Sequence, residues 1–483
     1  TKLLKNIAEQ NKDLESINEE IKNKNEKLKS LEDKINEINE EINGLEKSKN
    51  KKLEEINEQE KRKASLDAEV RVQTEKIKSI GAMPVEAFDS LNKNVFTPLE
   101  KSREKISEKE ALENLYQLTE KRGFEFPKRL QKAFHTSLKT SDTSCLTVMA
   151  GVSGTGKSAF PKMYAESMGL YFLPLSVEPR WDSPQDLFGF LNYMENRFEP
   201  TPLARSLIQF NNSPHSNENA NLRGNLLIVM LDEMNLARIE YYFSEFLSKL
   251  EMRRNINIED EKEYRMVSTE IYAGGKDVDG KKKELGTEEN TPIFLYAGYN
   301  ILFVGTMNED ETTQSLSDKV IDRANVLYFG KPDNLKINRQ NVDRHQAEWE
   351  PMSVDDWNQW HFEPDGASIK EFNKVEDQLN ELNNTLSELG RPFGWRTYKS
   401  IMSYIANHPD VCIDGKTGMQ PLSDQVVMRV MPKLKGLDLN EFNIVFEKLS
   451  NQLNQIDDPL LLDSFKKARS NPMGFFDWRG INW

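Results

Sequence analysis

The chain has 483 residues, and its 65 basic and 79 acidic side chains give a formal net charge of -14. This acidic excess argues against a protein dominated by non-specific nucleic-acid binding. Five histidines exclude a His-rich metal array, and two distant cysteines, Cys145 and Cys412, exclude a disulfide framework and a zinc quartet. Because neither a signal peptide nor an apolar run of eighteen residues is found, we expect a cytoplasmic protein without a membrane partner.

Residues 1–80 are almost free of Gly, Pro and aromatic residues, and apolar side chains recur on a heptad. The first a and d residues of this repeat are Leu3, Ile7, Gln10, Leu14, Ile17 and Ile21. The repeat predicts a long coiled coil, roughly 120 Å if fully extended. Its seam fails between Leu45 and Leu53, so the coil either folds back as a hairpin or runs straight and pairs with another subunit. Unequal arms favour the straight coil.

The segment Gly81-Ala82-Met83-Pro84 breaks this helix, and residues 81–122 are predicted to form a helical linker. A strand is predicted next, at the apolar run from Cys145 to Ala150. Directly after it, Gly151 to Ser158 fits the pattern G-x-x-x-x-G-K-[ST]. Such a loop directs successive backbone N–H groups and a helix dipole at a phosphate.

This loop predicts a nucleoside-triphosphate site. Lys157 is expected to reach the β- and γ-phosphates, and the Ser158 hydroxyl to coordinate Mg2+. The predicted nucleotide-binding residues are Gly151, Ser153, Gly154, Thr155, Gly156, Lys157, Ser158 and Asp232. Ahead of the strand, Gly123 to Pro127 is expected to pack near the nucleotide base.

A second apolar run, from Asn225 to Leu231, ends in the carboxylates Asp232 and Glu233. A continuous apolar run suits a central parallel strand, and such sheets bind ligands at their carboxyl edge. Asp232 is expected to hold Mg2+ through water, and Glu233 to orient and activate the attacking water. The alternative is a solvated helix start, where carboxylates are also favoured.

A third strand is predicted from Ile301 to Asn308, and a fourth from Val326 to Phe329 after a helix that closes with Asp322 and Arg323. We expect both polar ends at one edge of the sheet. Asn308 is then a sensor of the γ-phosphate or the attacking water. Arg323 is predicted to enter a neighbouring subunit's site as an arginine finger; its alternative is an ion pair with Asp322.

Together these motifs resemble an AAA+ ATPase module. Three segments narrow the resemblance to the McrB family of modification-dependent restriction motors, a relative of the MoxR and dynein groups. They are Leu231 to Phe243, Gly305 to Asp310 and Pro179 to Gly189. The resemblance implies a ring, usually a hexamer, that drives a separate McrC-like nuclease. A subgroup that carries coiled coils in bacterial defence loci is most similar.

The resemblance also covers a C-terminal helical lid, in which Arg391 to Tyr398 opens an amphipathic helix. Arg396 resembles a second sensor, which in related modules contacts the γ-phosphate of the same subunit's nucleotide. The alternatives are stacking on Trp395 or pairing with a carboxylate. Leu422 to Gly436 resembles a further lid helix that Pro432 limits or kinks.

The departures from the family also matter. Arg323 is the one candidate finger where the family's best-known member has several arginines, and no base-reading element is spelled out. ATP and GTP both remain open, with a lean to ATP. Lys281 to Lys283 is interpreted as a solvated loop rather than a nucleic-acid contact, and Arg197 to Pro202 as a pore or partner loop by position alone.

The predicted fold is therefore α/β: a coiled coil at 1–80, a helical linker at 81–122, a P-loop AAA+ core at 123–335, and a helical lid at 336–483. The leading hypothesis is a ring-forming nucleoside-triphosphatase that drives a nuclease partner, with the coil binding a further partner and nucleic acid as a possible target. The alternatives are a MoxR-like chaperone that remodels proteins and a nucleotide-gated coiled-coil scaffold.

Overall fold

The computed structural model describes residues 85–99, 103–192, 194–195, 197–272, 293–308, 316–330, 349–364 and 369–483. The predicted coiled coil and the loop with Lys281 to Lys283 lie outside the described residues. Within them, no helix is both long and apolar enough to cross a bilayer.

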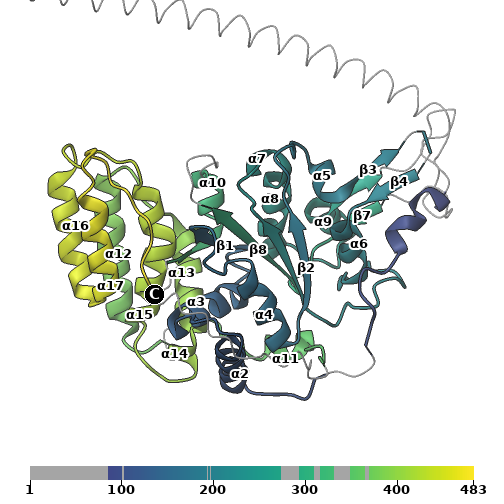
Figure 1. Ribbon diagram of the computed structural model, residues 1–483, viewed down its shortest axis with the longest axis horizontal. Coiled ribbons are helices and arrows are strands. Elements are labelled where there is room, and N and C mark those ends of the chain that lie inside the picture. Colours follow the sequence, from purple (N-terminus) through teal and green to yellow (C-terminus); the bar gives the residue numbers. More distant parts are fainter. Residues whose placement is uncertain are drawn as a thin grey trace, which may run out of the picture. The chain divides into compact units, whose positions relative to one another are not determined.

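A five-stranded parallel sheet forms the centre of the described fold (Figure 1). In chain order its strands are β1 (Leu146–Gly151), β2 (Tyr171–Ser176), β5 (Leu227–Asp232), β8 (Ile301–Asn308) and β9 (Ala324–Phe329). In space the order is β2-β5-β8-β1-β9. The predicted α/β core is confirmed, and the three central strands are buried along almost their whole length. That burial on both faces explains their continuous apolar sequences.

Strand β2 was not predicted from the sequence. It contains Pro174, which cannot donate a backbone hydrogen bond, and its exposure alternates along its second half. The structure accommodates both features because β2 is an edge strand that pairs only with β5 among the described strands.

Two antiparallel hairpins complete the strands, β3 (Gly189–Asn192) with β4 (Arg197–Pro200), and β6 (Thr269–Tyr272) with β7 (Ile293–Leu295). The helices up to β9 are η1 (Val85–Asn92), α2 (Glu108–Lys121), α3 (Lys128–Lys139), α4 (Ala159–Met168), α5 (Pro184–Phe188), α6 (Pro202–Gln209), α7 (Ile239–Tyr242), α8 (Ser244–Met252), η2 (Arg253–Asn255), α9 (Glu261–Val267) and α10 (Asp318–Ile321). Helix α2, within the predicted linker, packs on α4 and contributes Leu112 and Leu115 to the buried core.

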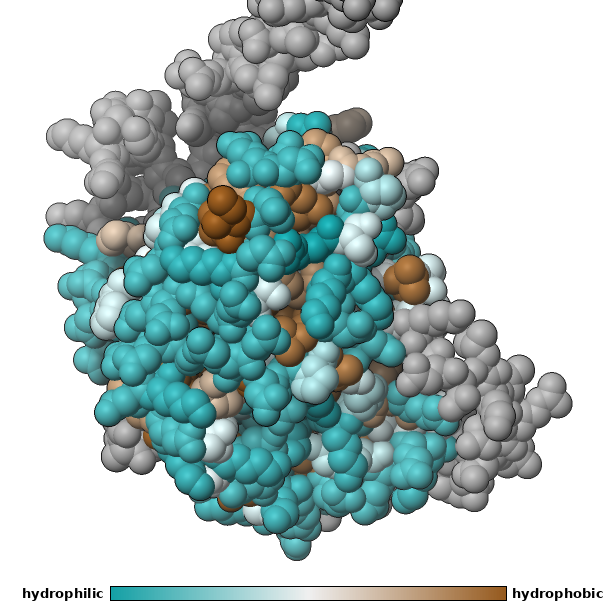
Figure 2. All heavy atoms as spheres, turned by 90° about the vertical axis from the view of Figure 1, so that its left-hand side faces the viewer, coloured by the Kyte–Doolittle hydropathy of each residue, from teal (hydrophilic) through white to brown (hydrophobic). Residues whose placement is uncertain are grey.

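After β9, α11 (Val354–Asn358) lies beside the end of α4, where the Met352 N–H donates to the Gly169 carbonyl oxygen, and the remaining helices gather into one group (Figure 1). The group consists of α12 (Phe372–Glu388), α13 (Trp395–Asn407), α14 (Pro409–Cys412), α15 (Met419–Gln425), η4 (Val426–Val430), η5 (Met431–Leu434), α16 (Asn443–Ile456) and α17 (Pro459–Arg469). Pro432 lies in the tight turn η5, which ends the helical run begun by α15, as the sequence predicted. Figure 2 shows mostly hydrophilic side chains on one face of the molecule, with apolar residues in small, separate spots.

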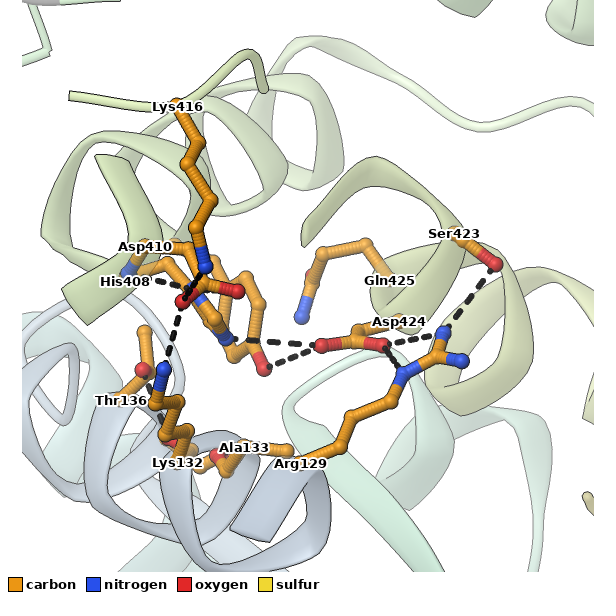
Figure 3. Close-up of polar contacts among 12 residues, drawn as sticks. Arg129, Lys132, Ala133, Thr136, His408, Asp410, Lys416, Ser423, Asp424 and Gln425 are labelled. Carbon is orange, nitrogen blue, oxygen red and sulfur yellow. Dashed lines mark hydrogen bonds and ion pairs between the residues drawn. The ribbon is translucent and has the colours of Figure 1, made fainter. Parts of the chain in front are cut away.

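A buried polar network joins α3 to these helices (Figure 3). Arg129 donates to Asp424 at 2.7 Å and to Asp458 at 2.5 Å, and Lys132 donates to Asp410 at 2.6 Å. Burial raises the pKa of Asp424 to about 7 and lowers the pKa of the neighbouring His408 to about 3. These charges are costly to separate once buried, so they fix how the C-terminal helices pack on α3.

Candidate nucleotide-binding site

The loop between β1 and α4 has the backbone that its glycines permit. Gly151, Gly154 and Gly156 have positive φ angles of 145°, 82° and 89°. A Cβ atom at Gly151 would lie 2.4 Å from the carbonyl oxygen of Phe329, which no side chain could tolerate. The pattern at Gly151 to Ser158 therefore reflects backbone geometry as well as chemistry.

Lys157 is held inside this loop. Its Nζ donates to the carbonyl oxygens of Gly151 at 2.9 Å and Val152 at 2.5 Å, and the residue is only 6% exposed. An ammonium group against the loop backbone supplies the positive charge that a bound phosphate needs.

The carboxyl ends of β1, β5 and β8 bring the next groups together. Ser158 Oγ donates to Asp232 Oδ1 at 2.7 Å, and Thr306 Oγ1 donates to the same oxygen at 2.6 Å. In the strand register Gly151 is paired with Asn308, so the loop and both polar strand ends share one edge. The parallel sheet therefore brings Lys157, Asp232 and Asn308 to the same edge, as the sequence predicted.

The donor set suits Mg2+ bound with a triphosphate. Hydroxyl and carboxylate oxygens are ligands that Mg2+ accepts, and it usually takes few protein ligands together with phosphate oxygens and water. Among the described residues, no group of three or more His, Cys, Asp or Glu could hold a metal alone. Ser158 and Asp232 therefore fit a metal that arrives with its nucleotide.

Glu233 has a backbone conformation that is unusual for its residue type, with φ at 54°. Hydrogen bonds from β8 hold it there: its N–H donates to Thr306 Oγ1 at 2.8 Å, and the next N–H, of Met234, donates to the Thr306 carbonyl at 2.9 Å. Asn308 Nδ2 donates to Glu233 Oε1 at 3.0 Å. Strain of this kind persists where surrounding contacts impose it, and it is frequent at functional sites.

Two aromatic rings lie against the loop at Gly156. Phe124 and Phe126 are stacked at 5.4 Å, and a Cβ at Gly156 would lie 2.9 Å from the Phe126 ring. Both rings are half-buried. The segment Gly123 to Pro127 thus offers an apolar surface beside the loop, and its place near the base stays a prediction.

Arg323 does not lie at this edge, and the expectation that it would share the edge of Asn308 is wrong. It directly precedes Ala324, which pairs with Leu146 at the start of β1, five residues before Gly151. In a parallel sheet, a residue before a strand lies at the amino edge, whereas one at a strand end lies at the carboxyl edge. The sequence interpretation overlooked this difference.

The ion pairs of Arg323 and Arg396 can be compared with the non-catalytic contacts that the sequence suggested for them. Arg323 pairs with Glu251 rather than Asp322, and Asp322 pairs with Lys433 instead. Arg396 pairs with the same Glu251, which agrees with the carboxylate alternative for that residue. The finger and sensor roles themselves stay predictions.

Two residues of interest escaped the sequence interpretation. Thr306 contacts both Asp232 and Glu233, and it precedes Asn308 by two residues on β8. Since side chains alternate along a strand, that spacing places Thr306 and Asn308 on one face and could have revealed it. Glu251 has no such signal, because its partners lie 72 and 145 residues away in the chain.

Comparison with known proteins adds little to this geometry. A family model described as a domain of unknown function (DUF8727) matches residues 354–470, the stretch from α11 to α17. No curated protein matches the chain. A solved structure from Cytophaga hutchinsonii ATCC 33406, described as a candidate ATPase, is similar at 15% identity and a TM-score of 0.37. It aligns with 67% of this chain and 88% of its own.

Proposed function

We propose that the chain is a Mg2+-dependent nucleoside-triphosphatase of the AAA+ type, which works as a ring and resembles the McrB motors. The observation that carries the proposal is the set of contacts at one sheet edge. There, a glycine loop with Lys157 adjoins Ser158, Asp232, Glu233 and Asn308. This combination of hydrogen-bond donors and carboxylates fits a bound triphosphate and the water that attacks it.

Each side chain has a separate task in this proposal. The loop N–H groups and Lys157 bind the β- and γ-phosphates. Ser158 and Asp232 hold Mg2+, which neutralises phosphate charge when bound. Glu233 accepts a proton from the water that attacks the γ-phosphate, and Asn308, already bonded to Glu233 Oε1, keeps that carboxylate directed at the water.

Arg323 is the part of the proposal that requires a second copy of the chain. Five residues of strand separate Leu146 from Gly151, or roughly 16 Å at about 3.3 Å per residue. Arg323 is therefore too far from the loop of its own subunit to touch that subunit's γ-phosphate. Its position supports a role in a neighbour's site, where an added guanidinium stabilises the charge of the transition state.

The restriction role extends the proposal beyond the site. We infer from the sequence resemblance that hydrolysis drives a McrC-like nuclease chain, and that ATP is preferred to GTP. The half-buried Phe124 and Phe126 are compatible with either base, because an apolar ring surface stacks on any purine.

Subunit mixing tests the proposal. Wild type, Glu233→Gln, Arg323→Ala and the control Arg265→Ala are assayed for ATP and GTP turnover, with assembly followed by light scattering. Arg265 suits the control because its guanidinium pairs with Glu261 within α9 and packs on Phe294, away from the residues assigned to the site. Glu233→Gln and Arg323→Ala are each expected to lose about 10³-fold in kcat, whereas Arg265→Ala keeps the wild-type rate. A mixture of Glu233→Gln and Arg323→Ala regains activity, because some sites then combine an intact Glu233 with a neighbour's Arg323.

The outcomes separate the alternatives. Assembly with negligible turnover, even with nuclease partner and nucleic acid present, would indicate the nucleotide-gated scaffold. Wild-type turnover in assembled Glu233→Gln or Arg323→Ala would show that the assigned residue has no part in hydrolysis.

A further inference from the structure

Glu251, at the end of α8, binds two arginines at once. Its Oε2 accepts from Arg323 Nε at 2.5 Å, and its Oε1 accepts from Arg396 Nη1. Arg323 directly precedes β9, and Arg396 lies in the first turn of α13. One carboxylate thus holds two guanidinium groups from distant parts of the chain, and the trio has a net charge of +1.

The trio lies far from the phosphate loop of its own subunit. Arg323 is at the amino edge of the sheet, as described above. Helix α13 is attached at the same edge, because Ser400 Oγ donates to the carbonyl oxygen of Thr143, just before β1, at 2.9 Å. Arg396 is one turn earlier on that helix. Arg396 is therefore held beside Arg323, through Glu251, and not beside the phosphate loop of its own subunit.

Buried hydrogen bonds of Arg429 fix the backbone next to the cluster of Glu251, Arg323 and Arg396. Arg429 is 1% exposed, and it donates to Asn325 Oδ1 at 3.0 Å, to the Asp322 carbonyl at 3.1 Å and to Ser144 Oγ. These bonds connect η4 to the residues that precede β1 and β9. A buried guanidinium with such partners cannot shift without leaving polar groups unsatisfied, so the backbone at Arg323 is well fixed.

The side chains of the same cluster are partly exposed to solvent. The side chains of Arg323, Glu251 and Arg396 are 15%, 27% and 48% exposed. Among contacts between described residues, neither Arg323 Nη2 nor Arg396 Nη2 makes a hydrogen bond. Beside them Trp395 is 69% exposed and is stacked on Tyr398. An exposed tryptophan next to arginines is typical of a protein interface.

We propose that Glu251 is a positioning residue. It holds Arg323 and Arg396 side by side so that their unused N–H groups face the terminal phosphate of a triphosphate bound by a second copy of the chain. The inference rests on the proposed function. Without the carboxylate, two like charges on flexible side chains repel each other and lose their common orientation, and a misplacement of about 1 Å can cost on the order of 10²-fold in rate.

The experiment compares Glu251→Ala and Glu251→Gln with wild type and with Glu245→Ala. Glu245 is the matched control because it lies on the same helix and pairs only with Lys249, at 3.2 Å, among the described residues. Turnover of ATP and GTP, affinity for a fluorescent ATP or GTP analogue, and assembly by light scattering are measured for each.

We expect Glu251→Ala to assemble and to bind the analogue within twofold of wild type, while its kcat falls about ten- to a hundredfold. Glu251→Gln keeps one acceptor oxygen and the side-chain volume, so its loss is smaller. Mixing Glu251→Ala with Glu233→Gln restores turnover, because the first supplies an intact site and the second supplies well-placed arginines. Mixing Glu251→Ala with Arg323→Ala restores nothing, because both defects concern what is offered to the neighbour.

Wild-type turnover in both Glu251 variants would overturn the positioning role, and so would rescue of Glu251→Ala by Arg323→Ala or a loss of analogue binding confined to the Glu251 variants. If the assembled wild type hydrolyses neither nucleotide, the proposed function and the positioning role fail together. Wild-type turnover with fully active Glu251 variants refutes the positioning role alone.

Discussion

The strained backbone at Glu233 predicts a stability effect opposite in sign to the usual one. Replacement of alanine by glycine inside a helix destabilises a protein by about 0.5–1 kcal/mol. At Glu233, however, φ is 54°, in the left-handed region where a Cβ atom is unfavourable. We therefore expect Glu233→Gly to be more stable than Glu233→Ala. Both variants lack the carboxylate, so they differ only in the Cβ atom.

The magnitude follows from two opposing terms. A left-handed conformation costs an L-residue about 1–2 kcal/mol, which glycine avoids. Glycine also gives the unfolded chain more freedom, which costs about 0.4–1 kcal/mol. The net advantage of Glu233→Gly over Glu233→Ala is about 0.5–1 kcal/mol in the free energy of unfolding. From the proposed role of Glu233, we expect both variants to hydrolyse nucleotide more slowly than the wild type, so that stability and activity move in different directions.

The assay is urea denaturation without nucleotide, followed by far-ultraviolet circular dichroism. Asp457, whose φ is 58° at the end of α16, should show the same glycine-over-alanine advantage without any change in turnover. Asn451, exposed inside α16, should show the reverse order. If glycine is no more stable than alanine at Glu233, the interpretation of its backbone as strained is refuted.

Two further predictions concern the loop and the buried network. Gly156→Ala should lower nucleotide affinity at least tenfold in an equilibrium binding assay, because its Cβ would lie 2.9 Å from Phe126 and its φ is 89°; unchanged affinity would contradict this. Because burial raises the pKa of Asp424 to about 7, its contribution to stability is present below about pH 4 and is lost as pH rises through 7. Asp424→Asn should therefore gain on the order of 2 kcal/mol relative to wild type between pH 5 and pH 8, measured by urea denaturation; a constant difference would show that Asp424 does not titrate there.

His408 also contributes to the pH dependence of the wild-type free energy of unfolding, and Asp424→Asn should make that contribution visible. Its pKa falls to about 3 on burial, so its contribution to stability is lost as pH falls below about 6.5. Between pH 4 and 6.5 this trend opposes that of Asp424, its neighbour at 3.6 Å. Asp424→Asn should consequently make stability rise more steeply with pH over that interval.

The sheet edge with the candidate nucleotide site was predictable because the sequence encodes it locally. Gly151 to Ser158 is contiguous, and each of Asp232 and Asn308 ends an apolar run that suits a central strand. Parallel pairing then brings these ends together without further information. Strand β2 was missed because an edge strand with Pro174 lacks a continuous apolar run.

The opposite edge could not be derived in this way. The sequence indicates that Arg323 precedes a strand, but the partner that holds it is Glu251, on a helix with no distinctive pattern. The same is true of Arg129, whose carboxylate partners lie 295 and 329 residues further along the chain. Local periodicity and backbone chemistry determine which residues form the glycine loop and the carboxyl edge of the sheet. Which charges meet across the sheet and the C-terminal helices depends on packing between distant segments, and only the tertiary structure decides that.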